Sequence, residues 1–254
     1  MRTSTGHEPG LGAHAAQESF VEETTQPNLL LRAMPAEALA ALEPHMERME
    51  VSLLEVLADS GKPHEHVYFP ETGVISIVNR FEDGTEVEVG TIGNEGMSGL
   101  NVILGADAIP GVTMMEVPGT AVRVPVSVMK AVADEHPEVL RLLHRYAQAF
   151  IVQVGQTAAC NRAHEIYGRC ARWMCMAHDR MGGAPQFLLA QHVLAQMLGV
   201  RRAGVTVAAG ALQKKGYIRY SRGKITILDR EGLESAACPC YRIVKREYDR
   251  LLGA

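Results

Sequence analysis

A stretch in the last quarter of the chain predicts two short helices followed by a β-hairpin. Few folds contain these elements in this order. The first helical segment is Gln191–Leu198, and Gly199-Val200 supplies a tight turn. The second helix runs over Arg201–Lys214, and Gly216 follows it at a position where glycine commonly ends helices. The segment "YIRYSRGKITIL" then alternates as two strands around a basic turn. The pattern therefore predicts a helix-turn-helix backed by a hairpin.

The same stretch is rich in basic residues and lacks acidic ones. Residues 181–228 contain seven Arg or Lys residues and no Asp or Glu. Residues 1–140 contain 22 acidic and 7 basic residues, whereas residues 141–254 contain 7 acidic and 18 basic residues. The net charge of −4 therefore conceals a cationic C-terminal half. A cationic domain on an acidic chain indicates a polyanionic partner, and the helix-turn-helix makes double-stranded DNA the expected one.

The chemistry of this stretch suits the major groove of DNA. The groove is about 12 Å wide and admits one α-helix, whose N-terminal residues meet base edges. Arg201 and Arg202 lie at that end of the second helix, where a guanidinium can pair with guanine or with phosphate. Gln191 and His192 are expected to donate to phosphate, and Arg222 and Lys224 to reach phosphates or the minor groove. Lys214 and Lys215 can do the same from the helix end, with solvated cations as the alternative. The alternative is a helix pair whose basic face is merely solvated, but composition, helix order and the "SRGK" turn together favour DNA.

The N-terminal half predicts a different architecture. Residues 1–27 are rich in Gly, Thr, Glu, Ala and His without periodicity, which is typical of a flexible arm. Helical segments follow, and short strands with glycine turns then extend from about Val51 to Val126. Asp83-Gly84, between two alternating runs, is typical of a hairpin turn. We therefore predict an antiparallel β-roll with flanking helices over residues 28–136.

The segment that follows is helical and has two apolar stripes. Pro137 suits the first position of a helix, and Gly168 predicts a bend before a second helix. Two stripes indicate packing on two sides, against the β-roll and against a second copy of the chain. We predict a dimerisation helix over residues 137–159 and a DNA-binding domain over residues 160–254. The expected interface consists of Val139, Leu143, Tyr146, Phe150 and Val154, and the second stripe includes Leu140, Ala147, Ile151 and Ala158. The alternative is a helix buried wholly within one chain.

Several segments of the chain resemble one family of proteins. They are "LAQMLGVRRAGVTVAAGALQKKGYIRYSRGKITILD" in the C-terminal half and "EHVYFPETGVISIV", "DGTEVEVGTIGNEGMSGL" and "VPGTAVRVP" in the N-terminal half. Over residues 28–254 the chain resembles the Crp/Fnr transcription regulators. The resemblance implies an α+β fold with a jelly-roll sensor domain of the cyclic-nucleotide-binding type, a long dimerisation helix and a winged helix-turn-helix. It also implies double-stranded DNA, a second copy of the chain and RNA polymerase as partners.

The predicted recognition helix matches this family at one position and departs from it at two. Arg202 stands where the family commonly has a base-reading arginine. Ala203 stands where well-studied members have an acid, and Val207 where many have a second base-reading arginine. Short apolar side chains cannot make those hydrogen bonds, so we expect Arg201, Arg202 and Thr206 to read a different DNA sequence. The operator, and whether binding activates or represses, are not determined by these residues.

The predicted sensor departs from the members that bind cyclic nucleotides. Those members have a Gly-Glu pair for the ribose and an Arg-Ser pair for the cyclic phosphate. This chain has Ser98 in place of the glutamate and no arginine between Arg80 and Arg123. Because a phosphate buried without a cation costs several kcal/mol, we expect no cyclic AMP binding in the usual mode. If another small molecule is sensed, we expect it at the loop of Glu95, Met97 and Ser98, with a purely structural turn as the alternative.

The cysteines predict no cofactor. Cys238-Pro239-Cys240 has no second pair to complete four metal ligands, so we expect ordinary small apolar residues, with a metal or redox role as the alternative. The first cysteine is Cys160, so the N-terminal cluster of the family's iron–sulfur members is missing. His64 and His66 alternate at a strand start, which is more typical of surface residues than of haem ligands.

The remaining signals favour a binding protein in the cytoplasm. We find no GxSxG, HExxH, P-loop or dinucleotide motif, so we do not expect an enzyme. No run of about 18 apolar residues and no secretory signal are present, so we expect neither membrane contact nor export. We predict a dimeric, sequence-specific DNA-binding transcription regulator that works without cyclic AMP. The alternative is a sensor or adaptor whose basic C-terminal domain docks on an acidic protein.

Overall fold

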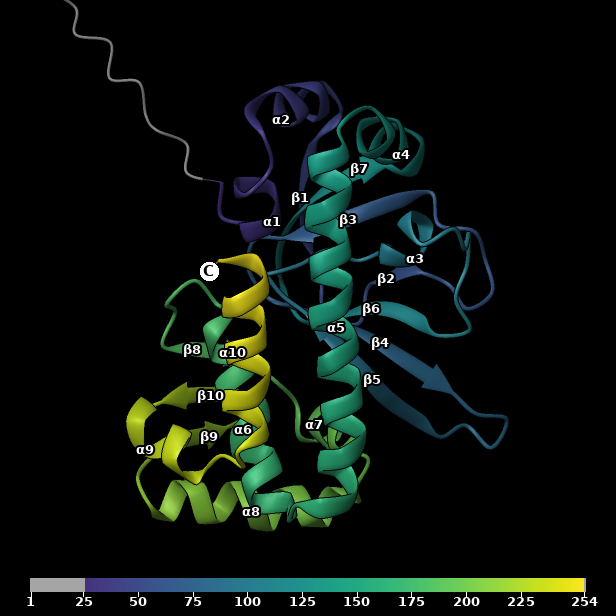
Figure 1. Ribbon diagram of the computed structural model, residues 1–254. Coiled ribbons are helices and arrows are strands. Elements are labelled where there is room, and N and C mark those ends of the chain that lie inside the picture. The colour runs from purple at the N-terminus through teal and green to yellow at the C-terminus, as the bar shows by residue number, and fades with distance from the viewer. Residues whose placement is uncertain (1–25, 254) are drawn as a thin grey trace, which may run out of the picture.

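The computed structural model describes residues 26–253 and combines a β-roll with a helical C-terminal domain (Figure 1). The arm predicted at residues 1–27 lies outside this range except for its last two residues. Both parts agree with the prediction of an α+β chain with an antiparallel roll and a C-terminal winged helix-turn-helix. Within residues 26–253, no helix has the length and apolar character needed to cross a membrane.

Two antiparallel sheets form the β-roll. One sheet has the strand order β1-β7-β3 and the other has the order β2-β6-β4-β5. The predicted turn is present between β4 and β5, where Gly84 has a φ of 79° and Phe81 N–H donates to Thr85 O at 2.9 Å. The strands are β1 (Glu47–Val51), β2 (Val56–Ala58), β3 (His66–Pro70), β4 (Val74–Arg80), β5 (Glu86–Ile92), β6 (Val112–Val117) and β7 (Gly119–Pro125).

Short helices flank the roll and tie its ends together. Asn28 caps the first of them, because its side-chain oxygen accepts hydrogen bonds from Leu30 N–H and Leu31 N–H at 3.0 and 3.2 Å. The amide nitrogen of Asn28 donates to Pro70 O at 2.8 Å and to Gly96 O at 2.9 Å, so this cap also anchors the helix to the roll. The elements are α1 (Leu29–Arg32), α2 (Ala36–Leu42), a 3-10 turn η1 (Glu43–His45), α3 (Leu100–Ile103) and α4 (Val126–Glu135).

The long helix α5 (Pro137–Ala163) begins where the sequence predicts and runs beyond residue 159. The chain then turns at His164-Glu165 into α6 (Ile166–Asp179). The prediction that Gly168 marks the bend is wrong, since this glycine lies inside α6. A Cβ at Gly168 would lie 3.4 Å from Cys238 Cβ, in ordinary van der Waals contact, so this glycine packs against Cys238 rather than forming a turn.

The C-terminal domain contains the predicted helix pair and hairpin, plus one strand that the sequence did not predict. That strand, β8 (Gln186–Leu188), pairs with β10 and completes a three-stranded sheet of order β8-β10-β9. Three residues are too few to show an alternating period, which is why β8 was missed. The other elements are α7 (Gln191–Leu198), α8 (Arg202–Lys214), β9 (Ile218–Ser221), β10 (Lys224–Ile227), α9 (Arg230–Ala236) and α10 (Cys240–Leu252).

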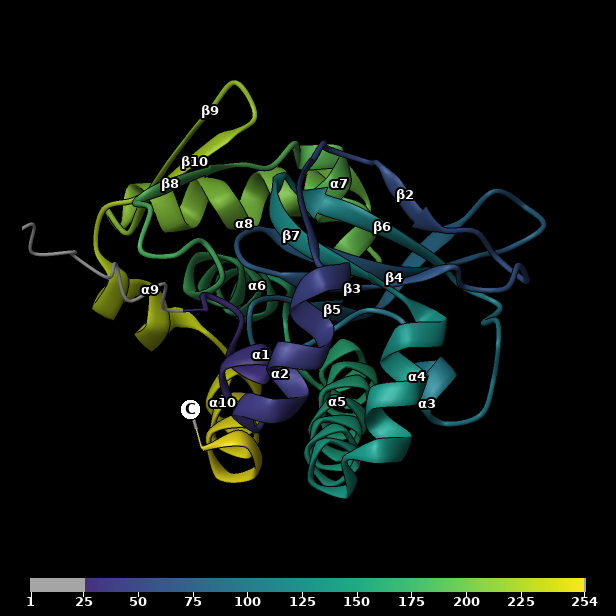
Figure 2. The ribbon, with the colours of Figure 1, turned by 90° about the horizontal axis from the view of Figure 1, so that it is seen from above.

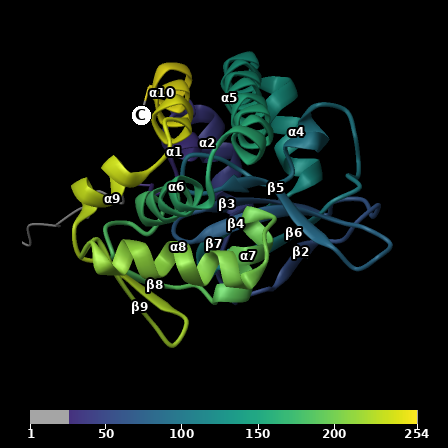
Figure 3. The same cartoon turned by 90° about the horizontal axis from the view of Figure 1, so that it is seen from below.

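The two parts of the chain share their hydrophobic cores. One core joins α6, α7 and α8 to the outer face of the sheet that contains β4 and β6, with Trp173 and Met174 among its buried members. A second core joins α5 to the roll, to α4 and to α10, which runs beside α5 (Figure 1). In the views from above and from below, α6 lies between α8 on one side of the molecule and the helices α5 and α10 on the other (Figures 2 and 3).

Candidate nucleic-acid interface

A glycine turn sets the angle between α7 and α8. Gly199 follows α7 with a φ of 58°, a left-handed conformation that glycine adopts without steric cost. Val200 N–H donates to Ala195 O at 3.0 Å and closes the turn. Arg201 is the N-terminal cap of α8, so the helix begins one residue later than predicted. The inner face of α8 is buried against the domain through Val205, Ala208, Ala209 and Leu212.

The outer face of α8 is open to solvent. Arg201 and Arg202 are exposed at its N-terminal end, and Val207 is 74% exposed in its middle. The Thr206 hydroxyl donates to Arg202 O at 3.1 Å, so it is engaged with its own helix but still lies on the exposed face. Lys214 is exposed at the other end. The buried and exposed residues of α8 thus fall on opposite faces of the helix.

The hairpin β9–β10 projects from the body of the domain beside α8 (Figure 2). Its two-residue turn is Arg222-Gly223, with φ values of 50° and 73°, as in a type I′ turn. Arg222 therefore holds a backbone conformation that side chains other than glycine rarely adopt. Arg222 and Lys224 are both exposed. Such a conformation at an exposed cation points to a functional rather than a packing role.

Four of the predicted residues line one hollow between the starts of α7 and α8 and the hairpin turn. They are Gln191, His192, Arg202 and Arg222, and the hollow measures about 470 Å³. Tyr220 forms part of its wall, fixed by a hydrogen bond from its hydroxyl to Leu189 O at 2.7 Å. The lining contains two guanidinium groups and no carboxylate. Such a recess at the start of a helix suits an anionic oxygen such as that of a phosphate.

The cations of this surface are free of acidic partners. Within the described part of the chain, no Asp or Glu forms an ion pair with Arg201, Arg202, Lys214, Lys215, Arg219, Arg222 or Lys224. We did not predict Arg219 as a site residue from the sequence. It is exposed and lies opposite Thr226 in the hairpin, a position that the alternation of side chains along a strand indicates. The seven side chains therefore provide an uncompensated positive surface.

The residues predicted for the dimer interface lie mostly inside the chain's own core. Val139, Leu143 and Tyr146 are at most 1% exposed, and they pack with α4, the roll and α10. Phe150 and Val154 are half-buried against Gly90 of β5. The first stripe of α5 is therefore occupied within one chain. The second stripe is open only in part: Ile151 is 61% exposed and Ala158 is exposed, but Ala147 is buried and Leu140 is half-buried.

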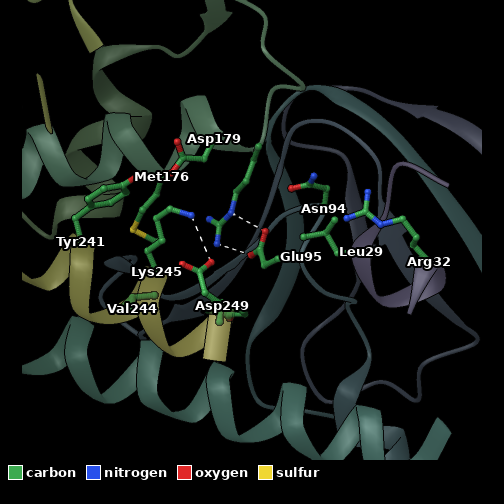
Figure 4. A pocket seen from close by; sticks show the side chains of 12 residues that line it. Leu29, Arg32, Asn94, Glu95, Met176, Asp179, Tyr241, Val244, Lys245 and Asp249 are labelled. Carbon is green, nitrogen blue, oxygen red and sulfur yellow. Dashed lines mark hydrogen bonds and ion pairs between the residues drawn. The ribbon is translucent and has the colours of Figure 1, made fainter. Parts of the chain in front are cut away.

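The loop predicted to contact an effector is engaged within the protein. Met97 is fully buried, and Ser98 is buried and bridges to Tyr68 of β3. Glu95 accepts hydrogen bonds from Arg180, at the end of α6, over 2.5 Å to Nη2 and 3.1 Å to Nε. The pair lines a pocket of about 350 Å³ between α10 and the roll. Figure 4 shows Glu95 facing this pocket, with Lys245 and Asp249 paired on its opposite wall.

A second pocket lies between the roll and α5. It measures about 170 Å³ and contains no charged residue in its lining. Tyr146 and Thr113 contribute hydroxyl groups, but the Tyr146 hydroxyl donates to Met97 O at 2.9 Å. The Thr113 hydroxyl is buried without a hydrogen-bond partner in the described structure. The pocket is thus small, apolar and without a cation.

Folding brings Cys238 and Cys240 close to two further metal-binding side chains. Cys160 and His164, at the end of α5, join them in a cluster whose ligand atoms all lie within 4.8 Å of one another. From the sequence we predicted no metal site, because Cys238-Pro239-Cys240 has no second pair of ligands near it along the chain. That second pair exists, but it precedes Cys238 by more than 70 positions and has the four-residue spacing of a helix face.

Comparisons with known proteins agree with this architecture. Residues 168–236 match the family model of the Crp-like helix-turn-helix domain. FixK2 from Bradyrhizobium japonicum is similar in structure, with 15% identity and a TM-score of 0.65 over 76% of this chain and 98% of its own. A regulator of the Crp/Fnr family from Eubacterium rectale has 16% identity and a TM-score of 0.61 over 82% of this chain and 96% of its own.

The c-di-GMP-responsive regulator CLP from Xanthomonas campestris has 14% identity and a TM-score of 0.59 over 76% of this chain and 99% of its own. A search among curated proteins found no significant match. The chain therefore has the fold of the Crp/Fnr-type regulators and carries a Crp-like helix-turn-helix domain at residues 168–236.

Proposed function

We propose that this protein is a sequence-specific, DNA-binding transcription regulator that acts as a dimer and does not use cyclic AMP. The observation that carries the proposal is the open, acid-free surface formed by α7, α8 and the hairpin. The outer face of α8 suits the major groove, and the hollow lined by His192, Arg202 and Arg222 suits a backbone phosphate. RNA polymerase is the further partner through which bound regulator would change transcription.

The contacts of this surface divide into two kinds. Arg201 and Arg202, at the start of α8, lie where a recognition helix meets base edges. The hairpin cations and the start of α7 flank that helix, where they would contact phosphates and fix the orientation of the domain. Only the first kind carries sequence information, so the specificity of this protein rests on few side chains.

The direct test replaces Arg202 by alanine. DNA fragments are first selected by the wild-type protein from a random duplex pool, and affinity is then measured on a selected and a random duplex. We expect Arg202→Ala to weaken specific binding by about 1–3 kcal/mol and to relax base preference at one position. Lys62→Ala, which removes an exposed cation of the sensor, serves as the matched control. Equal losses on both duplexes would make Arg202 a phosphate contact instead.

Salt dependence separates DNA from an acidic protein partner. If several phosphates are neutralised, the logarithm of the binding constant falls linearly with the logarithm of the salt concentration. We expect Arg222→Ala to reduce that slope by about one unit. No binding to any duplex pool at low salt would reject the proposal and favour the acidic partner.

The pocket between the roll and α5 supports the absence of cyclic AMP. Its volume of about 170 Å³ lies below the range of about 300–1,000 Å³ that is usual for ligand pockets. No lining side chain can neutralise a cyclic phosphate, which would therefore be buried without a partner. We expect calorimetry to detect no low-micromolar binding of cyclic AMP. Heat from a one-to-one complex that the pocket variant Thr113→Leu abolishes would contradict this expectation.

A further inference from the structure

Four sulfur and nitrogen ligands meet where α5 ends and α10 begins. Cys160 lies in the last turn of α5 and His164 directly follows that helix. Cys238 lies between α9 and α10, and Cys240 is the first residue of α10. Cys160 Sγ and Cys238 Sγ are 3.4 Å apart, and Cys240 Sγ is 3.3 Å from His164 Nδ1. All three cysteines are free thiols and are buried. The cluster therefore concentrates strong metal ligands in a place that bulk water does not fill.

The fold builds this cluster from both sides. Cys160 and His164 are four residues apart, so they project from the same face at the end of a helix. On the other side, Cys238 N–H donates to Gly168 O at 3.1 Å, which holds the turn before α10 against α6. Gly168 itself lies against Cys238, since a Cβ on this glycine would be 3.4 Å from Cys238 Cβ, in ordinary van der Waals contact. Backbone contacts thus position both halves of the cluster.

The ligand set and its spacing suit zinc. Three thiolates and one imidazole form a common structural zinc site. Tetrahedral Zn²⁺, with Zn–S of about 2.3 Å and Zn–N of about 2.0 Å, holds its ligand atoms roughly 3.5–3.8 Å apart. Two of the separations between ligand atoms are 3.3 and 3.4 Å, and no pair of ligand atoms exceeds 4.8 Å, so small side-chain rotations would complete the coordination. Mg²⁺ and Ca²⁺ prefer oxygen ligands, and the cluster offers none.

Two buried arginines beside the cluster provide a second, independent observation. Arg169 and Arg172 line a narrow recess together with Cys160. Both side chains are at least nine-tenths buried, and within residues 26–253 Arg169 Nε and Arg172 Nη1 have no hydrogen-bond acceptor. Three thiolates on one Zn²⁺ carry a net charge of −1, which a neighbouring guanidinium would offset. The arrangement supplies positive charge where a zinc–thiolate site would need it.

We propose that Cys160, His164, Cys238 and Cys240 bind one Zn²⁺ in a closed structural site that fastens the end of α5 to the start of α10. Four protein ligands leave no open coordination position, so the site holds structure and performs no catalysis. A disulfide between Cys160 and Cys238 would use only two of the four groups and would leave His164 and Cys240 without a role.

The site is connected to the DNA-reading helices by one arginine. Asn161, between the two ligands of α5, accepts a hydrogen bond from Arg169 Nη2 at 2.7 Å. The same nitrogen of Arg169 donates to the carbonyl of Leu198, the last residue of α7. Fixing Cys160 and His164 therefore also fixes Asn161, Arg169 and the end of α7. Loss of the metal is expected to loosen the pair α7–α8 without touching its DNA-facing side chains.

Metal analysis of the full chain tests the proposal. The protein is purified under reducing conditions without chelators, and its metals are measured by mass spectrometry after gel filtration. We expect one zinc per chain. When the protein is produced in cobalt-supplemented medium, we expect the visible bands of tetrahedral Co²⁺ together with thiolate-to-cobalt charge transfer. A mercurial reagent that blocks thiolates should release the zinc to an indicator dye.

Variants assign the metal to these residues. Cys160→Ala and Cys238→Ala are expected to lose the stoichiometric zinc and to lower the Tm. Cys170→Ala removes a buried cysteine of α6 outside the cluster and is expected to keep the zinc. If the cluster variants do not fold, zinc content, cobalt spectrum and mercurial release of the wild type still decide the question.

Three results would overturn the assignment. The first is wild-type protein without stoichiometric zinc whose Tm does not rise when Zn²⁺ is added. The second is iron with acid-labile sulfide in place of zinc. The third is a Cys160–Cys238 disulfide that persists in the protein as purified under reducing conditions. None of these measurements involves DNA, so failure of this proposal and failure of DNA binding are separate outcomes.

Discussion

Val207 places an apolar side chain where a DNA-reading helix usually presents a polar one. It is 74% exposed on α8, one turn beyond Ala203, and nothing in the described chain covers it. An exposed branched side chain in the major groove can contact the C5-methyl group of thymine, which is the only apolar group that the groove presents. Val207 is therefore suited to read thymine by methyl contact rather than by hydrogen bonds.

Replacing thymine by uracil tests the contact between Val207 and the thymine methyl group, because uracil lacks only that group. At the contacted position we expect the wild-type affinity to fall about fourfold, since one buried methyl group is worth about 0.8 kcal/mol. The same substitution should have little effect on the variant Val207→Ala. Thymine-to-uracil exchange outside the half-site is the control, and equal binding of all uracil-substituted operators by the wild type would contradict the contact.

Glu88 is a buried acid at the junction of the sensor and the DNA-binding domain. It accepts hydrogen bonds from Ser76 Oγ at 2.8 Å and from Trp173 Nε1 at 3.3 Å. Burial raises the pKa of Glu88 to about 7, and it raises the pKa of nearby Glu116 to about 8. The folded-state pKa of Glu88 exceeds its unfolded value, so its protonated form stabilises the fold below about pH 4.5. That contribution is lost as the pH rises through about 7.

The variant Glu88→Gln should remove this pH dependence. The neutral amide cannot ionise, so we expect it to raise the free energy of unfolding at pH 8 by up to about 3 kcal/mol, at about 1.4 kcal/mol per pKa unit. Below pH 5 the variant and the wild type should differ little. Urea unfolding at both pH values measures the effect, and Glu50→Gln, at an exposed position of β1, is the control. An equal gain at pH 5 and pH 8 would show that ionisation is not the cause.

At the scale of elements, Arg180 joins the end of α6 to two other segments. Its guanidinium pairs with Glu95 after β5, donates to the Thr91 hydroxyl at 2.7 Å and contacts Gln153 Oε1 of α5 at 3.3 Å. The side chains of Arg180 and Glu95 are only 7% and 13% exposed. Removing one charge would leave the other buried and unpaired, whereas removing both would not.

A double-mutant cycle tests the link. We expect Arg180→Met to destabilise the fold by about 3–5 kcal/mol, because Glu95 then loses its buried partner. Adding Glu95→Leu should restore part of that loss. The free energies of unfolding of the single and double variants in urea give the coupling. Additive losses, with no recovery in the double variant, would mean that packing around the arginine matters more than the charge pair.

The elements that the sequence predicts correctly are those with local signals. Gly199, Gly216 and Asp83-Gly84 mark turns because their backbone conformations depend on the residue itself, and the structure confirms all three turns. The place of Arg202 on the recognition surface follows from the turn at Gly199, because the next helix begins at Arg202. These features need no knowledge of distant parts of the chain.

Contacts between distant elements could not be predicted in this way. The period of α5 shows an apolar stripe but not its partner, and Tyr146 packs beside Tyr248 of α10 with ring centres 6.4 Å apart, rather than against a second chain. The four-ligand cluster depends on the same return of α10 to α5, which places Cys240 beside His164. Spacing along the chain does not contain that information.

At the scale of the whole molecule, the DNA-binding domain rests on the roll with its reading surface outward. Trp173 and Gln196 of this domain donate to Glu88 and Glu86 of β5, over 3.3 and 2.8 Å. The docking buries one side of the domain and leaves the outer face of α8 free (Figure 3). Among residues 26–253, no element masks that face. In the dimer that we propose, the spacing of the two domains would instead control DNA binding.

The exposed stripe of α5 is the face on which we expect a second copy to pair. Gln148, Ile151, Gly155 and Ala158 are exposed at alternating spacings of three and four residues, the period of a two-helix seam. Ile151 is the one large apolar side chain among them, and its burial would supply most of the apolar area. Two recognition helices held by this seam would need to be about 34 Å apart to read successive turns of DNA.

A charge at Ile151 should separate dimerisation from DNA affinity. We expect Ile151→Glu to be monomeric in light scattering, because a paired carboxylate would face its copy across an apolar seam. The affinity of this variant for a palindromic operator should fall to the affinity that the wild type has for a single half-site. The Tm of the variant should stay near the wild-type value, because position 151 is 61% exposed. Phe81→Glu, at the 56% exposed end of the β4–β5 hairpin, carries the same charge away from α5 and should remain dimeric. A dimeric Ile151→Glu variant with full operator affinity would place the interface on another face of the molecule.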